Sequence, residues 1–154
     1  MHSGDLENIE GQAARLYWKH LYGESFKRNR DADDANLLLN YGDSILRAMT
    51  ARACCAVGLH PTIGINHHNR YNAFCLADDI MEPFRPVVDR IVYNINPKND
   101  DVSLDKETRK KLLAIPLEKV ATADGKFALN DHLNTIASRL MKSILGGKNC
   151  LSFD

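Results

Sequence analysis

The chain has 154 residues, of which 44% are hydrophobic and 26% are charged, and its formal net charge at pH 7 is zero. This length and composition indicate a single globular domain that can bury a core without disulfide bonds or a structural metal. They exclude a global positive field that would attract nucleic acid, and the lack of a signal peptide or a long apolar run predicts a cytoplasmic protein without membrane contact.

The first third of the chain predicts two helices joined by a charged loop. Apolar residues recur at helical spacing through "LENIEGQAARLYWKHLYG", and Gly23 is a natural stop. The loop contains the basic run "FKRNR", which is either a solvated segment or a local patch for a polyanion. Residues 34–57 predict a long helix with an acidic start and Gly58 just past its end. Because this helix is apolar on most sides, we expect it at the centre of a helical bundle.

The middle of the chain predicts a loop followed by an interrupted helix. Glycines and a proline mark residues 58–71 as a loop. A helix is expected from about residue 72, with apolar residues on one side as far as Ile91. Pro83 and Pro86 lie within that pattern and predict a kink or a break.

The last third predicts two more helices. "NINPKNDDVS" is a connector, and a helix is expected around residues 104–113. After an irregular turn, a last helix is expected from about residue 130 to 145, with Asn130 as its cap and two glycines as its stop. Apart from a short strand near Phe127, no strand pattern is evident, so the predicted class is an all-α helical bundle.

The cysteines are predicted to be buried free thiols. No CxxC pair occurs, and Cys54 and Cys55 are adjacent inside an apolar helical pattern. A zinc site built on cysteine is therefore not expected.

The stretch "GINHHNRYNAFCLADDIMEPFRP" concentrates chemistry-bearing side chains. Asp78 and Asp79 are spaced i,i+4 and i,i+3 from Glu82, so they are either solvent-facing acids or a set that converges on one point. His67 and His68 lie in the loop before this helix, and either could fold back over its first turns. A histidine with carboxylates suits Mn²⁺ or Mg²⁺.

The first helix carries an unusual carboxylate. Glu10 is spaced at helical intervals from Leu6, Ala13, Ala14 and Tyr17, which places it on the apolar stripe that we expect to face the core. A buried carboxylate must be protonated, paired with a base or bound to a metal. Three acids and a histidine could then meet around one divalent cation with hard oxygen ligands, which suits phosphoryl chemistry.

Other site classes are not supported. No Ser-His-Asp or Cys-His pair has a recognisable setting, and neither a P-loop nor a Rossmann glycine fingerprint is present. A diiron redox bundle would carry paired Glu-x-x-His motifs, and the sequence contains none.

Four segments carry a resemblance to a known family. "NIEGQAARLYW", "LLLNYGDSILRAMTARA", "GLHPTIGINHHNRYNAF" and "LADDIMEPFRP" occur in the order and at the spacing found in the CRISPR-associated integrase of spacer acquisition, the "Cas one" family, and resemble its type II branch most. The resemblance implies the all-α C-terminal catalytic domain of that family, without its N-terminal β domain. We therefore expect one domain over residues 1–154, with residues 1–4 as a candidate added start.

The resemblance also implies site residues. The metal-binding and catalytic positions fall on Glu10, His67 and Glu82, with Asp79 as an additional metal candidate and Mn²⁺ or Mg²⁺ as the cofactor. It favours His67, where the residues alone left His67 and His68 open. The positions implied for DNA contact or support of the site are Tyr17, Asn40, Tyr41 and Arg85.

The implied activity is metal-dependent nicking and joining of DNA. The 3′-hydroxyl of a captured DNA fragment attacks a phosphodiester at the CRISPR repeat, and the implied partners are DNA, a second copy of the full-length protein and the small "Cas two" adaptation protein. The alternative is a catalytically inactive helical scaffold or DNA-binding module of the same fold. Alanine at Glu10 discriminates between an empty metal site, which it should stabilise, and a structural ion pair, which it should destabilise.

Overall fold

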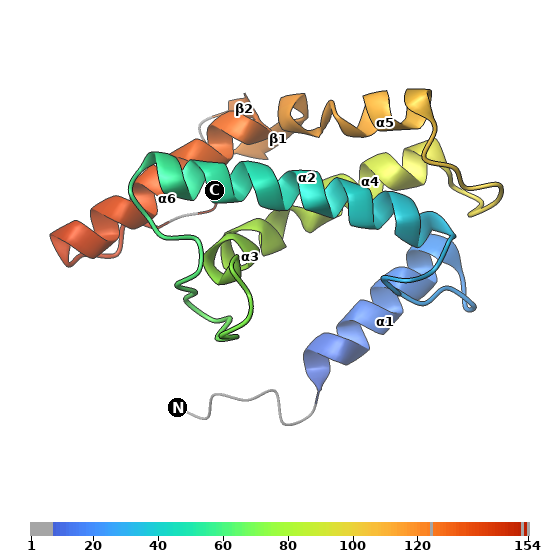
Figure 1. Ribbon diagram of the computed structural model, residues 1–154, viewed down its shortest axis with the longest axis horizontal. Coiled ribbons are helices and arrows are strands. Elements are labelled where there is room, and N and C mark those ends of the chain that lie inside the picture. The colour runs from blue at the N-terminus through green and yellow to red at the C-terminus, as the bar shows by residue number, and fades with distance from the viewer. Residues whose placement is uncertain (1–7, 124, 152, 154) are drawn as a thin grey trace.

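The computed structural model is a helical bundle with one small hairpin (Figure 1). It describes residues 8–123, 125–151 and 153, with the side chain of Glu10 outside the description. The elements in chain order are α1 (Ile9–Tyr22), α2 (Ala35–Ala56), α3 (Cys75–Met81), the 3₁₀ turn η1 (Glu82–Phe84), α4 (Arg85–Ile95), α5 (Lys106–Leu112), the 3₁₀ turn η2 (Ile115–Leu117), β1 (Lys119–Thr122), β2 (Gly125–Ala128) and α6 (Leu129–Gly146). The predicted all-α class is confirmed.

Helix α2 is the central element, as its apolar pattern predicted. It begins after Asp34, whose carboxylate accepts a hydrogen bond from the backbone N–H of Asn36 at 3.0 Å. Its core-facing leucines are at most 1% exposed, and it packs against α3, α4 and α6. A Cβ atom at Gly42 would lie 2.5 Å from a methyl group of Val88, so glycine at this position allows α4 to approach α2 closely.

The predicted break between Pro83 and Pro86 is confirmed. Helix α3 ends at Met81, the 3₁₀ turn η1 contains Pro83, and α4 starts at Arg85 with Pro86 in its first turn. The buried side chains of Met81 and Phe84 hold this junction against the core, while Glu82 remains exposed.

The last helix starts one residue earlier than expected. Ala128, rather than Asn130, is the N-cap residue of α6. The reason is tertiary: β1 and β2 pair from Lys119↔Ala128 onward, and the N–H of Leu129 then bonds to the carbonyl of Glu118 at 2.8 Å. The short strand expected near Phe127 is confirmed by β2.

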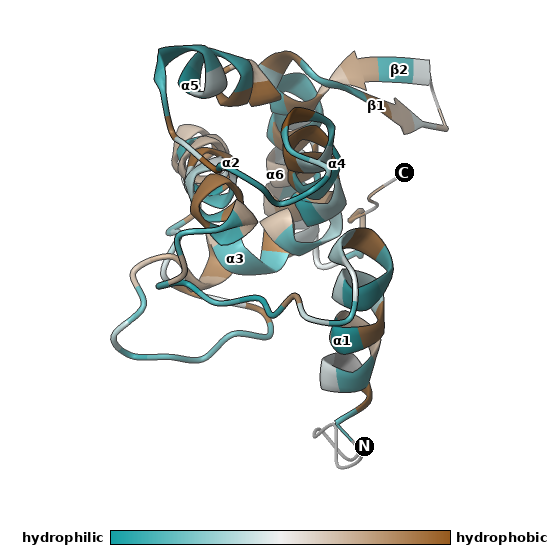
Figure 2. Ribbon diagram, turned by 90° about the vertical axis from the view of Figure 1, so that its right-hand side faces the viewer, coloured by the Kyte–Doolittle hydropathy of each residue, from teal (hydrophilic) through white to brown (hydrophobic). Residues whose placement is uncertain are grey.

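Helix α1 projects from the end of the bundle, and its expected burial is wrong (Figures 1 and 2). Ala13 and Ala14 are exposed, and Leu16 and Tyr17 are 56% and 40% exposed, so the described residues of the predicted stripe do not face a core. The expectation for Glu10 falls on a side chain outside the described residues. The C-terminal half of α1 docks on the body through a cluster of aromatic rings. Those rings are Trp18, Tyr22, Phe26 and Tyr93, with neighbouring centroids 4.6–6.5 Å apart.

Two further expectations from composition concern membranes and thiols. Within the described residues, no helix combines the length and the apolar character that crossing a bilayer requires. All four cysteines are free thiols, as predicted, but only Cys54 and Cys75 are buried, whereas Cys55 and Cys150 are exposed.

Candidate active site

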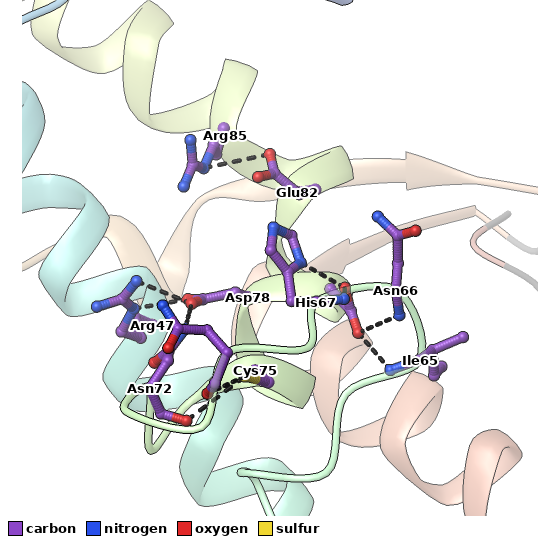
Figure 3. Close-up of polar contacts among 11 residues, drawn as sticks. Arg47, Ile65, Asn66, His67, Asn72, Cys75, Asp78, Glu82 and Arg85 are labelled. Carbon is purple, nitrogen blue, oxygen red and sulfur yellow. Dashed lines mark hydrogen bonds and ion pairs between the residues drawn. The ribbon is translucent and has the colours of Figure 1, made fainter. Parts of the chain in front are cut away.

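The carboxylate of Asp79 organises the loop that carries His67. Figure 3 labels the loop residues Ile65, Asn66 and His67, with dashed lines at their polar contacts. Its Oδ2 accepts hydrogen bonds from the backbone N–H groups of Ile65 and Asn66 at 2.5 and 2.9 Å. Its Oδ1 accepts the N–H of His67 at 3.1 Å and lies 2.5 Å from Nδ1 of the His67 ring. The Asp79 side chain is only 7% exposed, so it supports the loop from inside.

The loop needs a glycine to reach this carboxylate. A Cβ atom at Gly64 would overlap the backbone oxygen of His67 and would lie 2.9 Å from Cβ of Cys75 and 3.0 Å from Oδ2 of Asp79. The absence of a side chain at Gly64 therefore lets residues 65–67 turn tightly over α3.

Asp79 is held in its ionised form. Burial of its carboxyl group raises the pKa, but hydrogen bonds from the N–H of Asn66, the ring of His67 and the N–H of Ile65 outweigh burial, so the pKa lies below the ordinary value of 3.8. An ionised carboxylate facing Nδ1 favours the tautomer with a proton on Nδ1, which leaves Nε2 of His67 as the lone-pair donor.

Glu82 follows Asp79 by three residues, on the same side of the α3–η1 segment. In Figure 3 the imidazole ring of His67 points toward Glu82. The Glu82 side chain is 43% exposed, and its Oε2 lies 3.3 Å from Nε of Arg85. That Nε atom is buried but makes no hydrogen bond, so the pair is close without being well aligned.

Asp78 does not join this site, contrary to the expectation that Asp78 and Glu82 could converge. Its carboxylate receives Nε and Nη2 of Arg47 at 2.6 and 2.9 Å, and Nδ2 of Asn72 at 2.7 Å. Asp78 is 4% exposed, and the Arg47 guanidinium also lies 5.7 Å from the centre of the Phe74 ring. Asp78 therefore ties α3 to α2, and the prediction of three solvent-facing acids is wrong for it.

The remaining ligand candidate is Glu10, whose side chain lies outside the described residues. No group of three His, Cys, Asp or Glu side chains that could hold a metal ion gathers among the side chains that are described. The side chains of His67 and Glu82 fit part of a binding site for a divalent cation. The Nε2 atom of His67 is not the one that contacts Asp79, and the exposed carboxylate of Glu82 lies one turn away. Asp79 fits the supporting position behind the histidine, because both of its oxygens already accept hydrogen bonds.

The hydroxyl of Tyr17 contacts α4, although the side chain as a whole is partly exposed. Its hydroxyl donates a hydrogen bond of 2.9 Å to Oδ2 of Asp89, which is 5% exposed. Burial raises the pKa of Asp89 to about 6; the Tyr17 hydrogen bond and the charges of Arg28 and Arg85 act in the opposite direction, and the charge of Asp43 raises it further. Burial, followed by the charge of Asp89, also raises the pKa of Tyr17.

A cavity of about 920 Å³ lies beside Arg85, between α2 and α3. Its polar lining comprises Arg28, Arg30, Asn40, Ser44, Arg47 and Arg85, together with Asp43. Within the described part of the chain, the guanidinium group of Arg30 makes no ion pair, whereas Arg28 contacts Asp43 at 3.1 Å. Asn40 donates from Nδ2 to the backbone oxygen of Arg30 at 2.9 Å. Of the positions implied for DNA contact, Asn40 and Arg85 line this cavity, whereas Tyr41 packs against the core.

Sequence reasoning missed the roles of Asp89 and of the arginine-lined cavity. Asp89 lies three residues before the fully buried Val92, so the argument applied to Glu10 could have singled it out. The arginines come from a loop, from α2 and from α4, and no local spacing relates them. Two partial signals were present in the sequence: "FKRNR" as a local basic patch, and Asn40 and Arg85 as positions implied by the family resemblance.

The sequence of this chain is similar to a known protein family. A family model described as "CRISPR associated protein Cas1" matches residues 2–116. The CRISPR-associated endonuclease Cas1 of Neisseria meningitidis serogroup C (strain 8013) is 45% identical over 93 residues, which are 60% of this chain and 30% of that protein. The CRISPR-associated endonuclease Cas1 1 of Archaeoglobus fulgidus is 33% identical over 141 residues, which are 75% of this chain and 41% of that protein. The chain thus spans less than half the length of these relatives.

Two solved structures share the fold. One is a casposase bound to an integration product, with a TM-score of 0.74 at 22% identity, covering 96% of this chain and 49% of that one. The other is a Cas1 protein from Thermotoga maritima, with a TM-score of 0.74 at 24% identity, covering 94% of this chain and 54% of that one. The helical architecture therefore matches about half of each structure.

Proposed function

The chain belongs to the Cas1 family, and on that premise we propose that it is the part of a CRISPR adaptation protein that cuts and joins DNA with the help of a divalent metal. The observation that carries the proposal is the His67 imidazole, held by Asp79 with Nε2 left over and with Glu82 one turn beyond. The names of similar proteins, endonucleases and a casposase bound to an integration product, support the same class of reaction.

The proposed metal ligands are Glu10, His67 and Glu82, and the metal is Mn²⁺ or Mg²⁺. Imidazole together with carboxylate oxygens favours Mn²⁺ over Mg²⁺. Asp79 orients His67 rather than binding the metal, because a histidine ligand commonly donates its other ring N–H to a carboxylate. Glu82 would exchange part of its contact with Arg85 for the cation.

The proposed path for DNA is the arginine-lined cavity. Guanidinium groups bind phosphate oxygens through paired hydrogen bonds, and Arg30 has its charge available while Arg85 connects the cavity to Glu82. A chain with zero net charge can bind DNA only where basic groups gather locally, which this cavity provides.

In the joining reaction, the 3′-hydroxyl of one DNA end attacks a phosphorus atom in the target strand. A new P–O bond forms while the bond to the leaving 3′-oxygen breaks, and that oxygen takes up a proton as the attacking hydroxyl loses one, so the number of phosphodiester bonds is unchanged. A bound Mn²⁺ or Mg²⁺ would stabilise the charge on the phosphate and lower the pKa of the attacking hydroxyl. The arginines orient the phosphates, and Asp79 keeps the His67 ring from rotating.

The partners are proposed for the longer protein. They are a DNA fragment, the CRISPR repeat, a second copy of the Cas1 chain and the small "Cas two" adaptation protein. The proposed location of this reaction is the cytoplasm.

The test is calorimetric titration of Mn²⁺ into the metal-free protein. His67→Ala should abolish binding, and His68→Ala is the matched control because His68 is the exposed neighbour that Asp79 does not contact. Binding that is lost in both variants, or kept in both, would contradict the assignment of His67. A parent chain that binds no Mn²⁺ would favour the alternative of a helical scaffold that lacks catalysis.

DNA binding is tested separately, by the affinity for a DNA end at several salt concentrations. Arg30→Ala should weaken binding and reduce its salt dependence by about one phosphate contact. Arg90→Ala is the control, because Arg90 is exposed on α4 and pairs with Glu118 outside the cavity. Equal effects of the two variants would contradict a DNA path through the cavity.

A further inference from the structure

We infer that the hydrogen bond from Tyr17 to Asp89 fixes the orientation of α1 against α4 and thereby positions residue 10 for the metal site. Tyr17 and Asp89 are thus positioning residues that touch neither metal nor DNA. The first part of the inference concerns the fold alone, and the second part rests on the proposed function.

The hydrogen bond between Tyr17 and Asp89 has a well-defined geometry. The Tyr17 hydroxyl donates to Oδ2 of Asp89 at 2.9 Å across 72 positions of sequence. Asp89 is 5% exposed, so its carboxylate cannot exchange this donor freely for water. A hydrogen bond to a buried charged group is both strong and directional, which fixes a helix more tightly than apolar contact does.

The register of α1 relates residue 10 to Tyr17. Residues 10 and 17 both belong to α1 and are seven positions apart, close to two full turns, so they share one face of the helix. A bond that sets the rotation of α1 at residue 17 therefore also sets the face on which residue 10 lies.

Helix α4 connects Asp89 with the proposed metal ligand Glu82. Helix α4 starts at Arg85, directly after the turn η1 that contains Glu82. Asp89 is one turn beyond Arg85 on the same helix. Fixing α1 to Asp89 therefore also fixes it relative to Glu82, which the proposed function assigns to the same metal as Glu10.

The aromatic cluster cannot replace this bond. Trp18, Tyr22 and Phe26 attach the C-terminal end of α1 to the body by stacked and tilted rings. These contacts tolerate rotation and sliding, because burial of apolar surface is not directional. Toward the N-terminus Ile9 is 61% exposed, so it buries little apolar surface.

The test compares four variants of the full chain. Tyr17→Phe removes only the hydroxyl, Asp89→Ala removes the acceptor, and Asp89→Asn keeps an acceptor oxygen at the same place. Tyr93→Phe is the matched control: the Tyr93 ring packs on Tyr22 at 5.8 Å, and its hydroxyl has no hydrogen bond within the described residues. The first readout is the set of residual dipolar couplings of α1 amides relative to those of α2 and α4, measured without metal. The second is the Mn²⁺ dissociation constant.

We expect Tyr17→Phe and Asp89→Ala to reorient or loosen α1 and to weaken Mn²⁺ binding about tenfold, while Asp89→Asn and Tyr93→Phe behave like the parent. Unchanged couplings in Tyr17→Phe would overturn the inference, whatever the metal does. Reoriented α1 with unchanged Mn²⁺ affinity would overturn the positioning of residue 10. If the parent binds no Mn²⁺, the proposed function fails, and the couplings alone decide whether the bond sets the orientation of α1.

A double-mutant cycle separates positioning from general stability. In a Glu10→Gln background, Tyr17→Phe should no longer change the residual Mn²⁺ affinity, because the ligand that it positions is already absent. A further tenfold loss in that background would show that Tyr17 acts on the site independently of Glu10, against the inference.

Discussion

The two regions that carry the proposed metal ligands are held in very different ways. The loop with His67 is joined to α3 by one carboxylate that accepts three backbone N–H groups and faces the imidazole ring. Helix α1, with Glu10, is joined to the body by the hydrogen bond from Tyr17 to Asp89 and by aromatic rings in its C-terminal half. The loop with His67 is therefore preassembled by many polar contacts, whereas α1 is held by apolar ring contacts and a hydrogen bond between side chains.

This difference has an energetic consequence. Ordering a helix end on binding consumes part of the binding free energy, so the affinity for metal depends on how well α1 is already placed. We expect His67 and Glu82 to set the location of the metal and α1 to set its affinity.

The largest effect is expected at the preassembled half. Asp79→Ala removes the acceptor of three N–H groups and should lower the free energy of unfolding by about 3 kcal/mol, since each lost bond to a charged acceptor is worth ~1–2 kcal/mol and the exposed donors regain water. Urea denaturation measures the loss, and hydrogen exchange should accelerate at residues 65–67. Asp33→Ala, at an exposed acid, is the control, and an equal loss in both variants would contradict the role of Asp79.

A second substitution tests how tightly the backbone of the same loop is packed. Gly64→Ala places a Cβ atom against the carbonyl of His67 and should destabilise the protein by about 2 kcal/mol. A Cβ at Gly146 meets no atom within 4 Å, so Gly146→Ala should be neutral or slightly stabilising. Thermal unfolding of the two variants tests the difference, and a tolerated Gly64→Ala would mean that the loop is not tightly fixed.

The third prediction concerns pH and the bond that holds α1. The pKa of Asp89 in the folded protein, about 6, lies above its ordinary 3.8, so its contribution to stability is fully present below 3.8 and is lost as pH rises through about 6. Asp89→Asn removes this dependence and should gain about 1–2 kcal/mol relative to the parent between pH 4 and pH 8, within the ~3 kcal/mol that the pKa difference allows.

The comparison with the parent at each pH isolates Asp89 from other acids. Asp79, whose pKa is lowered, contributes stability above its ordinary pKa that is lost as pH falls, and this contribution is common to both proteins. A stability difference between Asp89→Asn and the parent that stays constant from pH 4 to pH 8 would contradict a buried, titrating Asp89.

The smallest effect is expected on the open face of α1. Leu16 is 56% exposed, so Leu16→Gln should change the free energy of unfolding by less than about 0.5 kcal/mol. The same substitution at Leu39, which is fully buried, should cost several times more. A large loss at Leu16, measured by urea denaturation, would mean that α1 packs against the body along its whole length.

Local signals in the sequence predicted most of the fold. Helix boundaries were predictable where one residue determines the local backbone. These residues are Asp34, Pro83, Pro86 and Gly23. The start of α6 was not predictable, because the β1–β2 hairpin rather than Asn130 sets it.

The site was less predictable than the fold. The residues alone could not choose between His67 and His68, since the choice depends on which ring reaches Asp79 across twelve positions. Asp78 and Asp79 are adjacent yet have different roles, one paired with Arg47 and one with the loop, and no local pattern distinguishes them. The resemblance to the family supplied the choice of His67, and the role of Asp89 emerged only from the structure.

The most direct measurement is paramagnetic broadening of amide signals during a titration with Mn²⁺. The chain, at 17.3 kDa, is small enough for backbone assignment. We expect the signals of His67, Glu82 and the N-terminal turn of α1 to broaden together at the same sub-stoichiometric concentrations of Mn²⁺. Broadening confined to the loop and η1, with α1 unaffected, or centred elsewhere in the protein, would contradict a metal site shared between the preassembled half and α1.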